Sequence, residues 1–390
     1  MRITDIVLTR VHGHYHGPHF PPGNSQITQL ALYPPLSPSP PPDPADAKRP
    51  IRGIYVEILT DDGTSGLYGP IEEEQAVVIR TALRPFLLGR DPLAGELLHD
   101  QMLRMHRHGR SGLFVMAISA IDCALWDLKG KAWGLPVYRL LGGPTRAAVP
   151  AYASMLGFAV APDQAAATAL DYRAAGYSAQ KWFFAYGPGD GEAGTAANLA
   201  LAQALREALG LHYPLMFDAF MGWDVAYARE MVSLLAPLRP RWLEEPIPPE
   251  RVGSLRQIRA AGVPIATGEH VYTRWQFKEL LVGEAVDVVQ ADPDWTGGIT
   301  ELVKIAALAS AFDVPLVAHG HSLLPALHVA AAVSPATVPM VEYLIRFQEH
   351  KQFFHSPILR PEQGMVPLPE APGLGIVLDE RSIEQRETLS

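Results

Sequence analysis

The stretches LMFDAF (215–220), RWLEEP (241–246) and IATGE (265–269) decide the fold of this 390-residue chain. Each is a short apolar run that reaches a carboxylate, and a longer segment with helical character separates it from the next. Their starts lie 26 and 24 residues apart, which is the length of one strand and one helix in a right-handed βαβ crossover. The pattern therefore predicts parallel strands whose carboxyl ends meet at one edge of a sheet.

The same spacing continues on both sides of these strands and gives eight predicted strands in total. The other five are VPAYAS (149–154), AQKWFF (179–184), DVVQAD (287–292), PLVAHG (315–320) and MVEYL (340–344). Eight such units favour a closed barrel over an open sheet. Because no eighth barrel helix is indicated after the last strand, we expect the α/β class and a (β/α)7β TIM-like barrel.

The first 130 or so residues have a different pattern, which is typical of a small α+β domain. A strand at Ile6–Val11 precedes a hairpin that turns at Asp62–Gly63, and helical segments follow. Between the strand and the hairpin lie the run HGHYHGPHF (12–20) and a proline-rich run (34–46), which we expect to form an exposed loop. The expected organisation is an N-terminal capping domain at 1–130, a catalytic barrel at 131–345 and a C-terminal segment at 346–390 that returns to the cap.

Composition excludes several classes of protein. The formal net charge is −9 and no run of Lys or Arg offsets it, so nucleic acid is not an expected partner. The single cysteine, Cys123, rules out an intrachain disulfide framework. No apolar run reaches about 18 residues and the N-terminus does not read as a signal peptide, so we expect no membrane association and a cytoplasmic location.

Three consecutive predicted strands deliver carboxylates to the same rim of the barrel: Asp218, Glu244 and Glu269. Carboxylates gathered there repel one another unless a cation lies between them, and hard oxygen ligands suit Mg²⁺. Acidic residues also occur at strand ends merely as polar starts of loops, but three in successive units favour a metal site. Strand alternation predicts that the neighbouring Glu245 faces away from Glu244.

Further polar residues are predicted at the same rim. Asp292 and His319 end the sixth and seventh strands, where the carboxylate can fix the tautomer of the imidazole and raise its basicity, as a general base requires. Without a metal site beside it, His319 would be interpreted as a hydrogen-bonded loop residue with no catalytic role. Lys181 on the second strand can point inward to hold a substrate anion or outward at a helix seam, and a carboxylic acid substrate favours inward. Glu342 on the eighth strand either donates a hydrogen bond when protonated or only solvates the strand end.

The segment ALWDLKGKAWGLPVYRLLGG (124–143), together with WLEEP, ATGEH and VAHG, resembles the enolase superfamily in its mandelate racemase branch, over nearly the whole chain. The resemblance implies abstraction of the proton α to a carboxylate, with Mg²⁺ stabilising the intermediate. It also implies roles for the residues above: Asp218, Glu244 and Glu269 as metal ligands, and His319 with Asp292 as the acid/base dyad. Lys181 and Glu342 are expected as further catalytic residues, with Glu342 near the stabilised oxygen.

One departure from that branch bears on the reaction. The branch commonly has Lys-x-Lys on the second strand, and the second lysine is a base, whereas this chain has Lys181 followed by Phe183. Racemisation of this type needs a base on each face of the substrate. A dehydratase can work with one residue, because His319 can remove the α-proton and then protonate the departing β-hydroxyl.

Within the branch the chain looks most like the L-rhamnonate dehydratases and related acid-sugar dehydratases, on stretches such as YGPGDGEAG (186–194) and ADPDWTGGIT (291–300). That resemblance implies a Mg²⁺-dependent hydro-lyase that converts an aldonate to a 2-keto-3-deoxy sugar acid, in a homo-oligomer such as an octamer. It places in the substrate pocket His270, a histidine of the N-terminal loop (His14, His16 or His19, with His19 preferred) and a cation among Lys48, Arg49 and Arg52 (Arg49 preferred). The alternatives are a racemase or epimerase of a 2-hydroxy acid, and a non-catalytic descendant of the fold.

Overall fold

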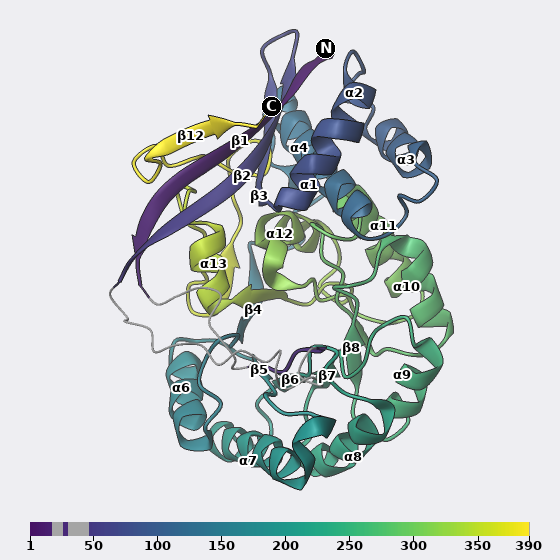
Figure 1. Ribbon diagram of the computed structural model, residues 1–390, viewed down its shortest axis with the longest axis vertical. Coiled ribbons are helices and arrows are strands. Elements are labelled where there is room, and N and C mark those ends of the chain that lie inside the picture. Colours follow the sequence, from purple (N-terminus) through teal and green to yellow (C-terminus); the bar gives the residue numbers. More distant parts are fainter. Residues whose placement is uncertain (18–25, 30–46, 390) are drawn as a thin grey trace.

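The cap is built on a four-stranded antiparallel sheet in the order β12-β1-β2-β3 (Figure 1). The computed structural model describes residues 1–17, 26–29 and 47–389. The strands of this sheet are β1 (Ile3–His16), β2 (Lys48–Thr60), β3 (Ser65–Ile71) and β12 (Gln385–Thr388). Because β12 pairs with β1 between Thr9 and His12, the C-terminal segment does return to the cap as expected. The proline-rich run 34–46 lies outside the described residues.

The predicted hairpin turn lies between β2 and β3. Gly63 has φ +85°, a conformation that glycine adopts at little cost. The carboxylate of Asp62 accepts hydrogen bonds from the Thr60 hydroxyl at 2.7 Å and from the Thr64 N–H at 3.0 Å. These local bonds fix the turn and thereby the register of the hairpin.

Helices cover one face of the cap sheet. They are α1 (Glu73–Val78), the π-helical turn η3 (Ile79–Leu83), α2 (Arg84–Leu87), α3 (Gly95–Met105) and α4 (Leu113–Trp133). The long helix α4 runs under the sheet and buries Ile118, Ile121, Leu125 and Leu128. Asp127 of α4 accepts hydrogen bonds from the N–H groups of Leu67 and Leu374, both at 2.8 Å. One carboxylate therefore ties together a cap strand, a cap helix and the C-terminal segment.

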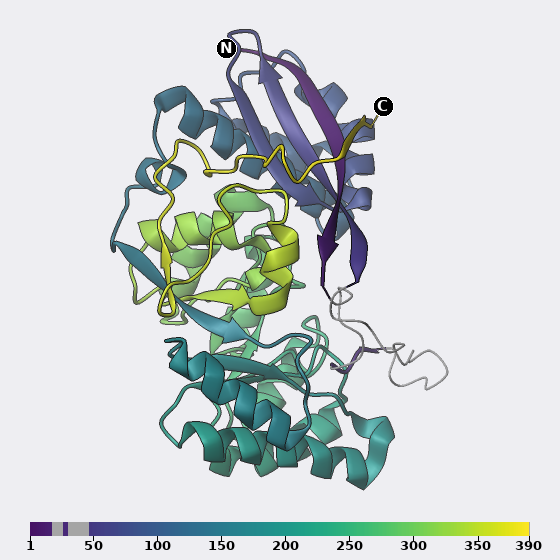
Figure 2. The same ribbon diagram turned by 90° about the vertical axis from the view of Figure 1, so that its left-hand side faces the viewer.

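The barrel follows α5 (Val137–Leu140) and forms a curled parallel sheet in the order β10-β4-β5-β6-β7-β8-β9. Its strands are β4 (Ala148–Ser154), β5 (Gln180–Phe183), β6 (Leu215–Asp218), β7 (Trp242–Glu244), β8 (Ile265–Thr267), β9 (Val288–Val289) and β10 (Val341–Leu344). The helices form the outer layer (Figures 1 and 2): α6 (Pro162–Ala174), α7 (Gly191–Leu209), α8 (Val225–Leu235), α9 (Val252–Arg259), α10 (Thr273–Val282), α11 (Gly298–Ser310) and α12 (Leu323–Ala332).

The seventh predicted strand, 315–320, is much shorter than expected. Leu316 forms an isolated bridge with Val289, and its N–H donates to the Thr337 carbonyl at 2.8 Å. Pro315 has no N–H to add to the ladder, and the chain enters the 3₁₀ turn η6 (Gly320–Ser322) soon afterwards. This segment still spans the gap between β9 and β10. After β10 comes the short helix α13 (Ile345–Lys351), in keeping with the absence of a full eighth barrel helix from the sequence pattern.

A layer of side chains fills the barrel interior, with one member from each of the eight predicted strands. All are at most 9% exposed: Tyr152, Ala179, Met216, Trp242, Ala266, Val288, Val317 and Met340. A single packed layer of this kind is what a closed barrel requires, since an open sheet would bring only neighbouring strands together. Within the described ranges, no helix has both the length and the apolar character needed to cross a membrane.

His328 of α12 joins the barrel to two other segments. Its Nδ1 accepts a hydrogen bond from the Tyr138 N–H at 3.1 Å, and its Nε2 donates to the Leu374 carbonyl at 3.2 Å. These two bonds require the neutral imidazole, because a proton on Nδ1 would meet the Tyr138 N–H. Burial lowers the pKa of His328 to about 4.

We therefore predict that His328 makes stability depend on pH. An unfolded histidine has a pKa of about 6.5, so between pH 6.5 and 4 the unfolded chain binds a proton that the folded chain does not. The contribution is fully present above pH 6.5 and falls by about 3 kcal/mol as pH drops to 4. Urea unfolding at pH 7, 6 and 5 should show a flatter profile for His328→Leu than for the wild type or for His212→Leu, an exposed control. Parallel profiles for all three proteins would contradict this.

Candidate active site

The carboxyl ends of the barrel strands carry a ring of polar side chains. Side chains alternate along a strand, so the residue two positions beyond each member of the interior layer faces the same way. Those positions are polar except for one glycine: Ser154, Lys181, Asp218, Glu244, Gly268, Gln290, His319 and Glu342. The strand pattern therefore brings Lys181, Asp218, Glu244, His319 and Glu342 together, as the sequence predicted.

The ammonium group of Lys181 lies at the centre of this ring. It is 3.1 Å from Asp218 Oδ2 and 2.9 Å from Glu342 Oε1, and it also forms an ion pair with Glu244. The side chain is 1% exposed. Burial lowers the pKa of Lys181, but the carboxylates outweigh it and hold the pKa well above its ordinary value. Lys181 thus points inward as predicted, and its contacts here are with the rim carboxylates.

Neighbouring donors fix the two carboxylates at the ends of β6 and β7. Glu244 Oε2 accepts hydrogen bonds from Trp242 Nε1 at 3.1 Å and from Gln290 Nε2 at 2.5 Å. Asp218 Oδ1 accepts from the Phe220 N–H at 2.9 Å. Each carboxylate therefore has one oxygen held by uncharged donors and one that faces the cation of Lys181.

Glu245 corrects an expectation from strand alternation, which predicted that it would face away from the rim carboxylates. It has φ +41°, so the extended conformation of β7 ends there and the alternation no longer applies. Its carboxylate accepts a hydrogen bond from the Thr267 hydroxyl at 3.1 Å and lies 2.9 Å from His270 Nδ1. Both glutamates of the WLEEP motif therefore reach the same region.

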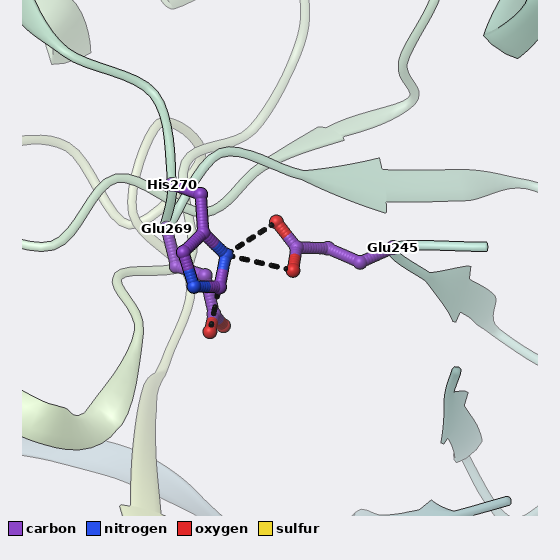
Figure 3. A group of neighbouring side chains, drawn as sticks. All are labelled: Glu245, Glu269 and His270. Carbon is purple, nitrogen blue, oxygen red and sulfur yellow. Dashed lines mark hydrogen bonds and ion pairs between the residues drawn. The ribbon is translucent and has the colours of Figure 1, made fainter. Parts of the chain in front are cut away.

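Glu245, Glu269 and His270 form a compact group beside the ring (Figure 3). One possible ligand atom from each lies within 4.8 Å of the other two, so the group could hold a metal ion. His270 Nδ1 is also 3.6 Å from Glu269 Oε1. On its other side, Glu269 Oε2 lies 3.4 Å from His319 Nε2. Glu269 therefore connects this acidic group to the imidazole of His319.

His319 and Asp292 form the predicted pair. His319 Nδ1 lies 2.8 Å from Asp292 Oδ2, while Asp292 Oδ1 accepts hydrogen bonds from the Ser322 hydroxyl at 2.6 Å and the Asp294 N–H at 2.7 Å. A carboxylate held in this way accepts the Nδ1–H proton, which leaves Nε2 as the nitrogen that faces the ring. Burial lowers the pKa of His319, but Glu269 and the other carboxylates raise it to about 10.

Burial and repulsion disfavour the charged forms of three carboxylates, Asp218 and Glu244 in the ring and Glu269 beside it. Burial raises the pKa of Asp218 to about 6, of Glu269 to about 7 and of Glu244 to about 8, and repulsion between neighbours adds to each. Such values are typical of carboxylates whose negative charge lacks a sufficient counter-charge.

Glu342 behaves differently from these three. Burial raises its pKa, but Lys181 and His319 outweigh burial and lower the pKa to about 2. Its Oε2 accepts a hydrogen bond from the Gly320 N–H at 2.7 Å. Of the two possibilities raised for Glu342, hydrogen-bond donation by a protonated carboxyl is the less compatible with this arrangement.

Two predicted pocket residues belong to the cap. His19 lies outside the described residues. Arg49 lies on β2 opposite Tyr15, and its Nε donates to the Gly17 carbonyl at 3.1 Å. This contact places Arg49 near the end of the ribbon formed by β1 and β2, one residue from where β2 begins.

Ile27 is a contact between cap and barrel that the sequence analysis missed. The side chain is 2% exposed, and the Ile27 N–H donates to the Phe184 carbonyl at 2.8 Å. A Cβ atom on Gly187 would lie 2.4 Å from Ile27, and one on Gly222 would lie 2.7 Å away. Two rim loops therefore need glycine where Ile27 is seated. The only signal was one isoleucine in the polar run NSQITQ (24–29), which has no periodicity to mark it.

This barrel, with its ring of acids, a lysine and a histidine under an α+β cap, defines an enzyme of the enolase superfamily. Residues 164–382 match the family described as enolase C-terminal domain-like, and residues 51–142 match the mandelate racemase / muconate lactonizing enzyme N-terminal domain. The chain belongs to this family.

Comparison with individual proteins shows which members of the family this chain is similar to. The L-rhamnonate dehydratase of Saccharopolyspora erythraea is 35% identical over 337 residues, which cover 84% of this chain and 83% of that protein. The crystal structure of rhamnonate dehydratase from Gibberella zeae complexed with Mg is 29% identical, with a TM-score of 0.84 over 98% of this chain and 95% of that chain. A racemase from Streptomyces coelicolor with bound magnesium is 29% identical, with a TM-score of 0.78 over 97% of this chain and 98% of that chain.

The position of Lys181 generates a prediction about stability. Removing its ammonium group leaves buried carboxylates without their cation, which typically costs about 3–5 kcal/mol. In EDTA, Lys181→Met should therefore lower the free energy of unfolding by about that amount. The control is Lys304→Met, which removes the partner of the exposed Glu96 and should cost about 0–1 kcal/mol. Equal losses in the two variants would show that the ring does not depend on Lys181.

Proposed function

We propose that this protein is a Mg²⁺-dependent acid-sugar dehydratase, a hydro-lyase that acts on an aldonate in the manner of L-rhamnonate dehydratase. The observation that carries the proposal is the asymmetry of the ring. A histidine–aspartate pair lies on one side, and on β5 the residue two positions after Lys181 is Phe183. The likeness to two rhamnonate dehydratases supports the same reaction.

The acidic residues fit a divalent cation. We assign Asp218, Glu244 and Glu269 as the ligands, because they lie at the ends of successive strands and because burial and mutual repulsion raise their pKa values, which a bound cation would lower. Glu245 is close enough to Glu269 to support that site. A cation there would also cancel much of the field that raises the pKa of His319, so that Nε2 could accept a proton near neutral pH. When bound, Mg²⁺ supplies positive charge beside the substrate carboxylate, where negative charge develops.

His319 performs the proton transfers in this proposal. Its Nε2 removes the proton from the carbon next to the substrate carboxylate, and the electron pair of that C–H bond moves toward the carboxylate. This electron pair then expels the hydroxyl group of the next carbon. The departing hydroxyl takes the proton back from His319 and leaves as water. The remaining enol becomes the 2-keto-3-deoxy acid. Asp292 holds the imidazole in the required tautomer throughout.

The alternative function is that of a racemase or epimerase. The structural similarity to the racemase from Streptomyces coelicolor supports this alternative. That reaction needs a second base on the opposite face of the substrate. Phe183 cannot move a proton, and its ring lies 5.2 Å from Lys181 Nζ. Lys181 is held protonated by three carboxylates, so it would be a poor base. These contacts favour elimination over stereochemical inversion.

Product analysis tests the proposal directly. Purified, Mg²⁺-loaded protein should convert at least one member of a panel of aldonates and aldarates to a 2-keto acid, detected as its semicarbazone. EDTA should abolish the conversion and added Mg²⁺ should restore it. Exchange of the α-proton with solvent deuterium, with a change of configuration and no 2-keto acid, would instead identify the racemase. Failure to convert any member of the panel would overturn the dehydratase.

A substitution separates catalysis from binding. His319→Asn should lower kcat by about 10²–10⁴-fold, the usual contribution of a general acid–base residue. Mg²⁺ affinity, measured by calorimetry, should stay close to that of the wild type, because His319 is not among the assigned ligands. His212→Asn, at an exposed position, is the matched control. A binding protein without catalytic function would respond to neither substitution.

We also propose that the protein works in the cytoplasm as a symmetric homo-oligomer, with an octamer as the expected form. Large apolar side chains on the surface of the single chain support an interface between copies, among them Trp133, Trp275 and Phe312, which are 54%, 49% and 42% exposed. Light scattering coupled to size exclusion gives the number of chains directly.

A further inference from the structure

A second imidazole–carboxylate pair lies beside the first. His321 Nδ1 is 2.8 Å from Asp294 Oδ2, and each member follows its counterpart in the His319–Asp292 pair by two positions. The two imidazole rings are nearly parallel, with centroids 6.5 Å apart and an interplanar angle of 7°. The proposed reaction uses His319 and gives no role to His321.

Aromatic rings hold His321 in place. The Trp295 ring lies 5.0 Å from His319 and 5.0 Å from His321, so one indole packs against both imidazoles. The Phe347 ring lies 5.0 Å from His321 as well. A ring packed in this way keeps its orientation, which is a requirement for a residue that selects between substrates.

Asp294 fixes the tautomer of His321. Its Oδ1 accepts a hydrogen bond from the Tyr68 hydroxyl, and its Oδ2 lies 3.0 Å from Lys351 Nζ. Lys351 also donates to the Pro70 carbonyl at 2.8 Å. An ionised Asp294 can only accept, so His321 Nδ1 is the donor and Nε2 is left for another partner. Although Asp292, Asp294 and His321 could by spacing hold a metal, Lys351 already supplies the positive charge at that oxygen.

Nε2 of His321 faces the cap segment that carries Glu72. Among the described residues, the ionic neighbour of Nε2 is Glu72 Oε1 at 3.8 Å, which is too long for a hydrogen bond. The His321 side chain is 12% exposed. A hydroxyl group suits this position, because it can donate to the neutral Nε2 or accept from the protonated one. A second carboxylate does not suit it, because Glu72 and Asp294 would repel the charge.

We propose that His321 is a specificity-determining residue that binds a hydroxyl of the substrate chain beyond C3, and that with Glu72 it selects aldonates over aldarates. The proposal rests on the proposed dehydratase function, in which the substrate carboxylate lies at the metal and C2 lies at His319. The chain of a longer sugar acid then extends from His319 past Trp295 toward His321. A terminal carboxylate in place of the hydroxyl would meet Glu72.

The first test uses His321→Phe, which keeps an aromatic ring between Trp295 and Phe347 and removes Nε2. For five- and six-carbon aldonates, KM should rise about tenfold or more with a smaller change in kcat, the effect of losing one hydrogen bond to the substrate. Glycerate, which has no hydroxyl beyond C3, should show no change in KM or, where it is not turned over, in its inhibition constant. An equal loss for short and long acids, or no loss for either, would overturn the proposal.

The second test uses Glu72→Gln, with Glu74→Gln on the same helix as its exposed control. Removing the negative charge at position 72 should raise kcat/KM for six-carbon aldarates relative to aldonates, and the control should leave this ratio unchanged. An unchanged ratio in Glu72→Gln would contradict the role of Glu72. A wild-type protein that dehydrates no acid sugar would instead refute the proposed function, so the two failures are distinguishable.

Discussion

The ion pairs of one buried lysine hold the rim of the barrel together. Lys181 contacts carboxylates from β6, β7 and β10, which are far apart in the sequence and would repel one another without a cation. Burial strengthens these ion pairs, but one lysine does not balance all of the negative charge at the rim. The pKa values of Asp218, Glu244 and Glu269 therefore remain raised. The protein therefore keeps a site in which negative charge exceeds positive charge, as a resident divalent cation requires.

Spacing and alternation predicted much of this arrangement. Eight apolar runs at intervals of one βα unit predicted the barrel, and strand ends predicted which carboxylates meet. Side chains alternate along each barrel strand, so the inward positions of Lys181, Asp218, Glu244 and Glu342 follow from a period of two. The alternation no longer holds where the chain leaves the extended conformation. The positive φ of Glu245 turns its side chain to the rim, and Pro315 shortens the seventh strand to a bridge.

Contacts between the cap and the barrel were harder to predict, for a related reason. Ile27 is a single apolar residue in a polar run. Its packing site becomes apparent only from the structure, where it lies against Gly187 and Gly222. His321 lies on a 3₁₀ turn rather than a strand, and its partners Tyr68 and Lys351 come from distant segments. No local pattern encodes such a meeting of three segments. The residue proposed to determine specificity, His321, therefore lies where the sequence pattern carries little information.

The pairing of β12 with β1 has a consequence for how the chain is made. The first strand of the cap emerges from the ribosome before the barrel, and its partner between Gln385 and Thr388 emerges after it. The whole barrel is synthesised in the interval. Closing a sheet across this sequence separation is slow, because the loop entropy must be lost before the pairing stabilises the ends. The barrel can therefore form before the cap sheet is complete, and β12 then joins that sheet by pairing with β1.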